Sequence, residues 1–256
     1  MFTLLSYKLK RHLPAFVTGL LVLLAWEAVV RGFSISKWLL PSPSRVFLSM
    51  FSDRALLVGH SVRTLQEAIV GLTLATVAGL VLGGLVFSFR ALRRTLYPFL
   101  VISQTIPIIV LIPLLIMWLG FGMTPKLVIV ALACFFPVAV NTVDGLSAAD
   151  REKVDLLRSM GANSWQTFRL VQVPSALPQI LSGIRIGATY AIMAAVVAEW
   201  MGSDKGLGVF IVRASNSFRT DRVFAGIVLV SFFSILLFQS VNLLQRWLTP
   251  WAIEES

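Results

Sequence analysis

Long apolar runs constrain the fold of this chain more than any other feature. Runs of about 20 apolar residues recur along the sequence, and a helix of that length crosses about 30 Å of hydrocarbon. Of the 256 residues, 57% are hydrophobic and 13% are charged, far from the balance of a soluble domain. Segments of alternating hydrophobicity, which are typical of a membrane β-barrel, are absent. The sequence therefore predicts an all-α integral membrane protein.

Six apolar runs have the length of a transmembrane helix. They lie at residues 14–30, 62–89, 97–119, 126–146, 179–201 and 223–248. A short external helix is expected between the first two, with Ser44 as its N-cap. No low-complexity linker divides the chain, so we expect a single domain over residues 1–256.

The second and third runs contain residues that affect helix packing. The second run carries four glycines: Gly71, Gly79, Gly83 and Gly84. Small residues on one face allow two helices to approach closely within a membrane. The third run contains Pro107 and Pro113, each of which removes a backbone donor. We therefore expect the third span to be broken or bent and to face a neighbouring helix or a wet cavity.

The net charge is +10, and its basic residues cluster at the ends of apolar runs. Contact with anionic lipid headgroups and a role in membrane topology explain this placement better than nucleic-acid binding does. Three groups of basic residues fall on one side of a six-span chain: Lys8, Lys10 and Arg11; Arg90, Arg93 and Arg94; and Arg151, Lys153, Arg158 and Arg169. By the positive-inside rule that side, with the N-terminus, is cytoplasmic. No cleavage site follows the first run, so we interpret it as an uncleaved span.

No metal site is expected. His12, His60 and Cys134 are isolated from one another, and no cluster has the spacing of metal ligands.

A polar segment at residues 147–178 interrupts the apolar pattern. Residues 150–160 favour a helix with early acidic residues and Arg158 near its end, and Gly161 ends it. Asn163 or Ser164 then caps a second helix over 165–171, which has Trp165, Phe168 and Val171 on one apolar stripe. Pro174 and Pro178 are expected to stop this helix before the fifth span. The residues alone fit either a docking element or an interfacial helix resting on headgroups.

The order of residues in this segment resembles the cytoplasmic loop of binding-protein-dependent ABC importer permeases of the type I fold. That family motif has Glu-Ala-Ala, three residues, Gly and then Leu-Pro about a dozen residues on. Here Asp155-Leu156-Leu157 replaces Glu-Ala-Ala, and the glycine and both prolines are present. The resemblance implies a type I permease fold with a cytoplasmic coupling helix. It also implies that these residues contact an ATPase: Asp155, Arg158, Gly161, Ala162, Trp165, Phe168, Pro174 and Pro178.

The resemblance extends over nearly the whole chain. Ser61 to Leu65, Pro107 to Gly122, and Ala198-Glu199 leading to Gly206-Leu207-Gly208 are similar to the subgroup that imports nitrate, sulfonates, taurine, riboflavin or thiamine-pyrimidine precursors. The implied protein is an ATP-driven importer subunit in the cell inner membrane. Its implied partners are a second permease copy, two ATP-binding subunits and an extracytoplasmic binding protein.

The permease itself is not expected to be an enzyme. The phosphate-binding pattern G-x-x-x-x-G-K-[ST] is absent, so we expect no cofactor in this chain, with ATP and Mg²⁺ bound by the partner ATPase.

Polar and aromatic residues of the spans are candidates for the translocation path or its gate: Gln104, Thr105, Pro107, Trp118, Asn141, Tyr190, Met193 and Glu199. Glu199 fits a gate or binding-protein contact as well as an interfacial anchor. Gln104, Thr105 and Asn141 also fit bridges between helices. Glu27, Glu67 and Arg185 fit structural pairs or path positions.

Aromatic and thioether surfaces with few charges favour a flat, uncharged heterocycle, such as a pyrimidine-type vitamin precursor or riboflavin. A sulfonate, taurine or nitrate permease is the alternative within the class. An ion-coupled secondary transporter needs a coupling-ion site and inverted repeats, and a membrane enzyme needs a catalytic constellation; neither is evident in the sequence.

Overall fold

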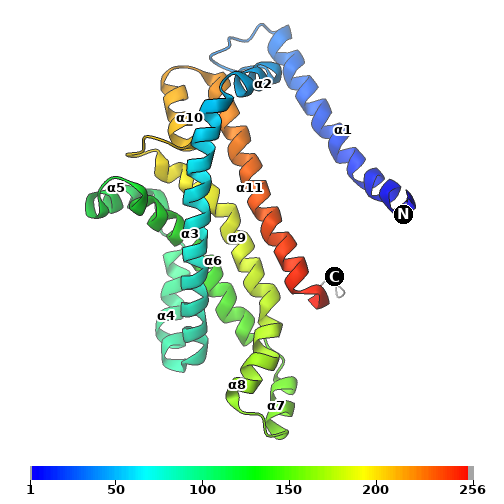
Figure 1. The fold of residues 1–256 in the computed structure, drawn as a ribbon, viewed down its shortest axis with the longest axis vertical. Coiled ribbons are helices and arrows are strands. Elements are labelled where there is room, and N and C mark those ends of the chain that lie inside the picture. Colours follow the sequence, from blue (N-terminus) through cyan, green and yellow to red (C-terminus); the bar gives the residue numbers. More distant parts are fainter. Residues whose placement is uncertain (1, 253–256) are drawn as a thin grey trace. The chain divides into compact units, whose positions relative to one another are not determined.

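The computed structural model describes the backbone of residues 2–252 and the side chains of residues 13–252 (Figure 1). Every regular element in this part of the chain is helical, as predicted. Lys8, Lys10, Arg11 and His12 lie outside the described side chains. The chain forms two compact units, one of Met1–Val58 with Phe210–Val228 and one of Gly59–Val209 with Leu229–Ser256. The single-domain expectation stays a prediction.

The first unit contains α1 (Phe2–Gly32), α2 (Pro43–Ser52) and the beginning of α11 (Thr220–Leu248). The N-cap of α2 is Ser42 rather than the expected Ser44, because Pro43 takes the first helical position, where its missing N–H costs nothing. Glu27 of α1 instead accepts hydrogen bonds from the backbone N–H of Ser44 at 3.0 Å and from its hydroxyl at 2.8 Å. Glu27 also pairs with Arg31 at 2.6 Å, so it has a structural role.

Other polar contacts complete the first unit. Arg222 forms a bidentate pair with Asp53, with both N···O distances at 2.8 Å. The Thr220 hydroxyl donates to the carbonyl of Trp38 at 2.7 Å, and Trp26 packs on Phe224 with ring centroids 5.4 Å apart.

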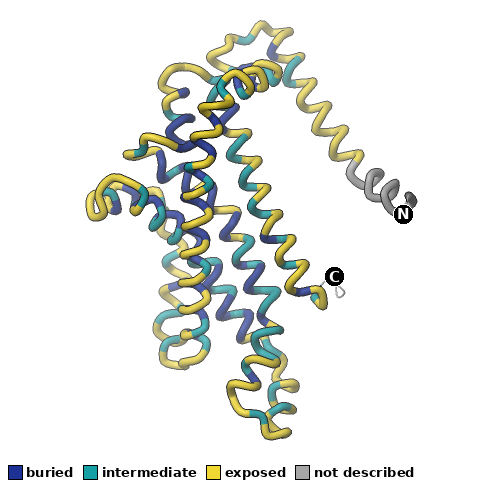
Figure 2. The backbone as a smooth tube through the Cα atoms, in the orientation of Figure 1, coloured by how far each residue is buried: buried dark blue, intermediate teal, exposed yellow. Residues whose placement is uncertain are grey.

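The second unit is built around α6 (Met123–Ser147) and α9 (Val173–Glu199), the most buried long helices of the unit (Figure 2). Around them lie α3 (Arg54–Ser88), α4 (Arg90–Ser103), α5 (Ile108–Leu119) and the later part of α11. The short elements are α7 (Arg151–Ser159), α8 (Ser164–Thr167), the π-helical turn η1 (Phe168–Gln172), α10 (Leu207–Asn216) and η2 (Pro250–Ala252). The start of α4 and the α7–α8 loop lie at one end of this unit, and the 200–206 loop lies toward the other end (Figure 1).

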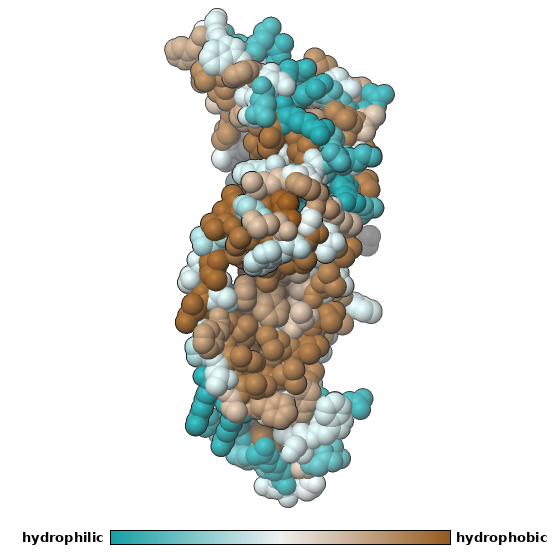
Figure 3. All heavy atoms as spheres, turned by 90° about the vertical axis from the view of Figure 1, so that its left-hand side faces the viewer, coloured by the Kyte–Doolittle hydropathy of each residue, from teal (hydrophilic) through white to brown (hydrophobic). Residues whose placement is uncertain are grey.

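Length and apolar character identify five described helices as candidate spans, and the pair α4 and α5 makes a sixth. This agrees with the six predicted runs. Many large apolar side chains remain exposed, as expected for surfaces that contact lipid. Figure 3 shows apolar side chains gathered over the middle of one face, with hydrophilic side chains below them at its lower end.

The third span is bent by 101° between α4 and α5, which confirms the predicted interruption. Pro107 is responsible for it, since it is the N-cap of α5 and its backbone is extended (φ −64°, ψ 112°). Pro113 lies inside α5 and does not end the helix.

The prolines of the polar segment do not stop the helix that precedes the fifth span. Helix continues from Ser164 to Glu199 as one 36-residue element, which corrects the expected stop at Pro174 and Pro178. The π-helical turn η1 ends at Gln172, two residues before Pro174, and changes the hydrogen-bond register ahead of that proline. Such local adjustments let a helix pass a residue that lacks an N–H.

Three of the four glycines predicted for the second span form the expected small face of α3. A Cβ on Gly71 or Gly79 would lie 2.5 Å or 2.8 Å from the side chain of Val130 or Val138 of α6. A Cβ on Gly83 would lie 2.7 Å from Thr142, whereas one on Gly84 would meet nothing within 4 Å. Gly84 is therefore outside the contact, and the other three let α3 pack directly on α6.

We predict that Gly79→Val destabilises the protein by about 1–3 kcal/mol, because the added side chain overpacks the α3–α6 contact. Gly84→Val is the matched control, since it adds the same β-branched residue to the same helix in open space. Thermal unfolding of the detergent-purified variants measures the difference. Equal unfolding temperatures for the two variants would contradict this packing.

Candidate functional site

A cavity of about 400 Å³ lies in the second unit, between the broken third span and helices α6 and α9. Its walls are mainly aliphatic and aromatic, with polar groups at the break between α4 and α5. The lining residues are Ser103, Gln104, Ile106, Ile108, Ile109, Ile129, Ala133, Phe136, Pro137, Tyr190, Met193, Ala194 and Val197. None of them is Asp, Glu, Lys, Arg or His, so the cavity offers aromatic, thioether, hydroxyl and amide groups to a ligand.

Three predicted path residues, Gln104, Tyr190 and Met193, come together in this cavity. Tyr190 and Met193 share a face of α9, and Gln104 ends α4. Phe136 was not predicted, because an aromatic residue within an apolar helix has no distinguishing sequence signal.

The other predicted path residues do not line the cavity. The Thr105 hydroxyl donates to the Ile102 carbonyl at 2.7 Å, and Asn141 donates its amide to the Pro137 carbonyl at 2.7 Å. Pro107 shapes the bend beside the cavity. Trp118 is 69% exposed near the end of α5.

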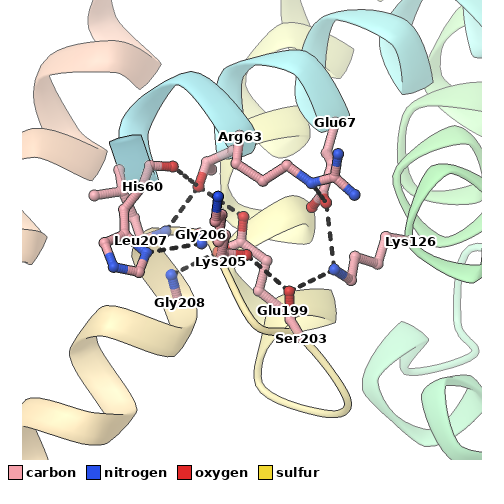
Figure 4. A network of polar contacts seen from close by, with 11 residues as sticks. His60, Arg63, Glu67, Lys126, Glu199, Ser203, Lys205, Gly206, Leu207 and Gly208 are labelled. Atoms are coloured by element: carbon pink, nitrogen blue, oxygen red, sulfur yellow. Dashed lines mark hydrogen bonds and ion pairs between the residues drawn. The ribbon is translucent and has the colours of Figure 1, made fainter. Parts of the chain in front are cut away.

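Glu199 belongs to a different cluster, at the end of α9 (Figure 4). Its carboxylate has no exposed surface. One oxygen accepts the Thr64 hydroxyl of α3 at 2.6 Å, and the other accepts the backbone N–H of Gly208 at 2.6 Å. Thr64 also accepts the N–H of Leu207 at 2.8 Å, and His60 Nδ1 accepts the N–H of Gly206 at 2.9 Å. These bonds hold the start of α10 against α3.

A second buried carboxylate, Glu67, lies one turn further along α3. It pairs with Arg63 at 2.9 Å and with Lys126 of α6 at 3.3 Å. Glu67 is fully buried and Lys126 is only 4% exposed. Lys126 also donates to the Ser203 hydroxyl at 2.5 Å, and Ser203 donates to the Lys205 carbonyl at 2.7 Å. The two acids are thus accompanied by two cations, which reduces the cost of burying them.

We call Thr64, Glu67, Lys126, Glu199 and Ser203 the polar brace. It joins α3, α6, α9 and the 200–206 loop within the second unit. Glu199 was predicted as a path or gate residue, and Glu67 was left between a structural pair and a path position. The ion pairs of Glu67 with Arg63 and Lys126 agree with the structural pair. Glu199 has no exposed surface, so the contacts of its carboxyl group in this structure are internal hydrogen bonds.

An apolar cluster separates the brace from the cavity. Ile112, Leu115, Ile129 and Ala198 are its buried members, with Ile108 and Val197 packed against them. Ile108, Ile129 and Val197 also line the cavity. Ala198 is adjacent to Glu199, and Ile129 lies one turn after Lys126. Two of the helices that line the cavity, α6 and α9, therefore each carry a brace residue near one end.

Arg185 lies within α9 and outside the cavity lining. It donates to the Ser182 hydroxyl at 3.3 Å, and its guanidinium lies 5.7 Å from the centroid of the Phe238 ring. These contacts agree with a structural role.

At the opposite end of the second unit, the polar segment forms two helices joined at Gly161, as predicted. Gly161 has φ +85°, a left-handed conformation that favours glycine. Its N–H donates to the carbonyl of Arg158 and that of Ala162 donates to the carbonyl of Leu157, both at 3.0 Å. Together these bonds form a Schellman motif that ends α7.

The second helix begins with a capping box. Asn163 accepts the N–H of Gln166 at 2.9 Å, and Gln166 accepts the N–H of Asn163 at 2.8 Å. Phe168 stacks on Phe87 of α3 with centroids 6.5 Å apart, and this fixes the loop to the membrane helices. Trp165 stacks on Phe168 but is 67% exposed.

The loop presents further apolar surface. Leu156, Met160 and Leu170 are each more than half exposed, whereas Asp155 and Arg158 are exposed polar neighbours. Pro174 and Pro178 are half-buried within the continuous helix. Exposed apolar side chains in a polar loop are typical of a surface that binds another protein.

Known proteins of similar sequence are inner-membrane transport components. Residues 75–253 match the family model of the binding-protein-dependent transport system inner membrane component. The formylaminopyrimidine transport permease protein ThiX of Halalkalibacterium halodurans is 37% identical over 233 residues, covering 91% of this chain and 93% of that protein. The riboflavin transport system permease protein RibX of Chloroflexus aurantiacus is 36% identical over 238 residues, covering 92% and 88%.

A solved structure is similar in fold. A chain from the inward-facing MetNI methionine ABC transporter superposes with a TM-score of 0.67 at 22% identity, covering 77% of this chain and 97% of that chain. The helical architecture and these relatives define a multi-pass permease component of an ABC importer. The chain belongs to the family of binding-protein-dependent transport system inner membrane components.

We predict that Gly161→Val leaves the spans folded but weakens attachment of the ATPase. A Cβ at Gly161 would meet nothing within 4 Å, so the expected cost is the left-handed backbone, about 1–2 kcal/mol, which shifts the loop to another conformation. Gly120→Val is the matched control, since Gly120 also has a positive φ (+74°) and open space but lies outside the loop. Pull-down of the ATPase subunit measures attachment. Equal recovery of the ATPase with both variants would show that the loop is not the docking element.

Proposed function

We propose that this permease forms the translocation path for a flat, uncharged heterocycle of the pyrimidine-precursor or riboflavin type. It works as a homodimer with two ATP-binding subunits, and an extracytoplasmic binding protein delivers the solute. ATP and Mg²⁺ are bound by the ATPase subunits, so this chain itself carries no cofactor. The protein lies in the cell inner membrane with its N-terminus on the cytoplasmic side.

The cavity carries the proposal of substrate class. Tyr190 and Phe136 supply aromatic surface, Met193 supplies a polarisable thioether and Gln104 supplies an amide that can donate and accept hydrogen bonds. Such walls suit a planar ring with a few polar edges. Two relatives named for formylaminopyrimidine and riboflavin transport agree with this class.

The polar segment at residues 147–178, which we call the coupling loop, supports the proposal of an ATPase partner. Its exposed residues, Trp165 among them, lie at the end of the second unit where α4 begins with Arg90, Arg93 and Arg94 (Figure 1). The start of α4 and the coupling loop are both rich in basic residues and lie at the same end of the unit, which agrees with a cytoplasmic location for both. The same rule then places the polar brace toward the external side.

A sulfonate, taurine or nitrate is the alternative substrate. A path for such an anion is expected to present a cation, and the cavity lining contains none. The lining therefore favours the heterocycle.

Uptake into vesicles tests the substrate class. The permease, its ATPase and its binding protein are reconstituted, and labelled formylaminopyrimidine, riboflavin and taurine are offered separately with and without ATP. We expect ATP-dependent uptake of one of the two heterocycles and none of taurine. ATP-driven taurine uptake without heterocycle uptake would overturn the proposal.

We predict that Tyr190→Ala raises the KM for the heterocycle about tenfold, because the loss of one aromatic contact costs about 1–1.5 kcal/mol. Ile186→Ala is the control, since Ile186 lies one turn earlier on α9 outside the cavity lining. Initial uptake rates at varied concentrations of binding protein loaded with substrate give the two KM values. An unchanged KM for Tyr190→Ala would place the substrate elsewhere.

A further inference from the structure

One helix connects the coupling loop to the polar brace. The helical stretch from Ser164 to Glu199 has 36 residues, which corresponds to a length of about 54 Å. Its first turn carries the capping box of the coupling loop, and its last residue is Glu199 of the brace. A displacement of the loop therefore has a direct structural connection to the far end of the second unit.

Glu199 attaches the far end of this helix to its neighbours. Its two oxygens accept bonds from Thr64 of α3 and from the N–H of Gly208, and both bonds are buried. A buried hydrogen bond is costly to break, because it leaves an unpaired polar group away from water. The attachment is therefore directional and stiff.

Lys126 extends the attachment to α6 and to the 200–206 loop. Its ammonium contacts Glu67 and Ser203, and it lies one turn before the cavity residue Ile129 (Figure 4). The two helices that supply most of the cavity wall, α6 and α9, are thus joined at one end by the brace. Glu199 and Lys126 do not line the cavity themselves.

We propose that the polar brace is a positioning element that transmits coupling-loop movement to the external end of the path. Movement of α9 carries α3, α6 and the 200–206 loop with it, so the path opens in step with the ATPase. Without the Thr64 bond, the end of α9 loses this connection to α3, and ATP is hydrolysed without transport. This inference rests on the proposed docking of an ATPase at the coupling loop.

Thr64→Val tests the inference with little change in shape. The valine removes the hydroxyl that donates to Glu199 and accepts from Leu207. Thr73→Val is the matched control on the same helix, because the Thr73 hydroxyl bonds only to the Ile69 carbonyl at 2.8 Å among the described residues. The readout is the number of ATP molecules hydrolysed per substrate molecule imported by the reconstituted complex.

We expect this ratio to rise about fivefold or more in Thr64→Val, with the amount of assembled complex unchanged. Thr73→Val should keep the wild-type ratio. Thr64→Ser restores the hydroxyl and should return the ratio to the wild-type value, which a general loss of stability would not predict. A wild-type ratio in Thr64→Val would overturn the inference.

Ser203→Ala provides a second test if Thr64→Val fails to assemble. Ser203 is only partly buried, and its hydroxyl is a partner of Lys126. An elevated ratio supports the brace, and a wild-type ratio overturns it. Failure of the proposed function is distinguishable, because the wild-type complex would then show no ATP-dependent uptake at all.

Discussion

A carboxylate without exposed surface must find hydrogen-bond donors inside the protein, and Glu199 finds them in two distant parts of the sequence. Thr64 lies 135 residues earlier, and Gly208 lies 9 residues later. In a chain whose spans lie in hydrocarbon, neither water nor lipid tails can replace these donors at a buried site. Glu199 therefore connects the end of α9 both to α3 and to the segment that follows the 200–206 loop.

The other features of the second unit follow from a fixed end of α9. Glycines of α3 bring that helix against α6, and Lys126 of α6 completes the charge balance around Glu67. The bend at Pro107 leaves space beside α6 and α9, and the cavity occupies it. At the other end of α9, Phe168 on Phe87 anchors the coupling loop to α3. The helical stretch that ends in α9 thus begins in the polar loop, lines the cavity and is held at its far end by Glu199.

The sequence predicted those features that depend on local pattern. Apolar run length located the six spans, Pro107 predicted the broken one, and Gly161 with Asn163 predicted the two coupling helices. The helix stop predicted at Pro174 and Pro178 was wrong. The helix continues past both prolines after a π-helical turn, and nothing in the local sequence indicates such a turn. Ser44 was preferred as a cap because the contribution of Glu27, from another helix, is a tertiary contact.

The cavity and the brace were only partly predictable for the same reason. Tyr190 and Met193 share a helix face, so their common location follows from helical spacing. The partnership of Lys126 with Glu67 joins residues 59 apart in the sequence, and no periodicity connects them. An ionisable residue near an apolar run indicates that a partner exists but does not identify it.

A pair of distances within one protomer tests most directly whether α9 and the brace move as one body. Spin labels are attached at Ser159→Cys, at the end of α7, and at Asp204→Cys, in the 200–206 loop, after the single native cysteine Cys134 is replaced by alanine. Only one permease copy in each complex carries the labels. We predict that the distance between the labels stays constant, within about 2 Å, between nucleotide-free and ATP-bound complexes, because a continuous helix anchored at both ends moves rigidly. A change of about one helical turn, 5.4 Å or more, would show that the coupling loop and the brace end of α9 move independently.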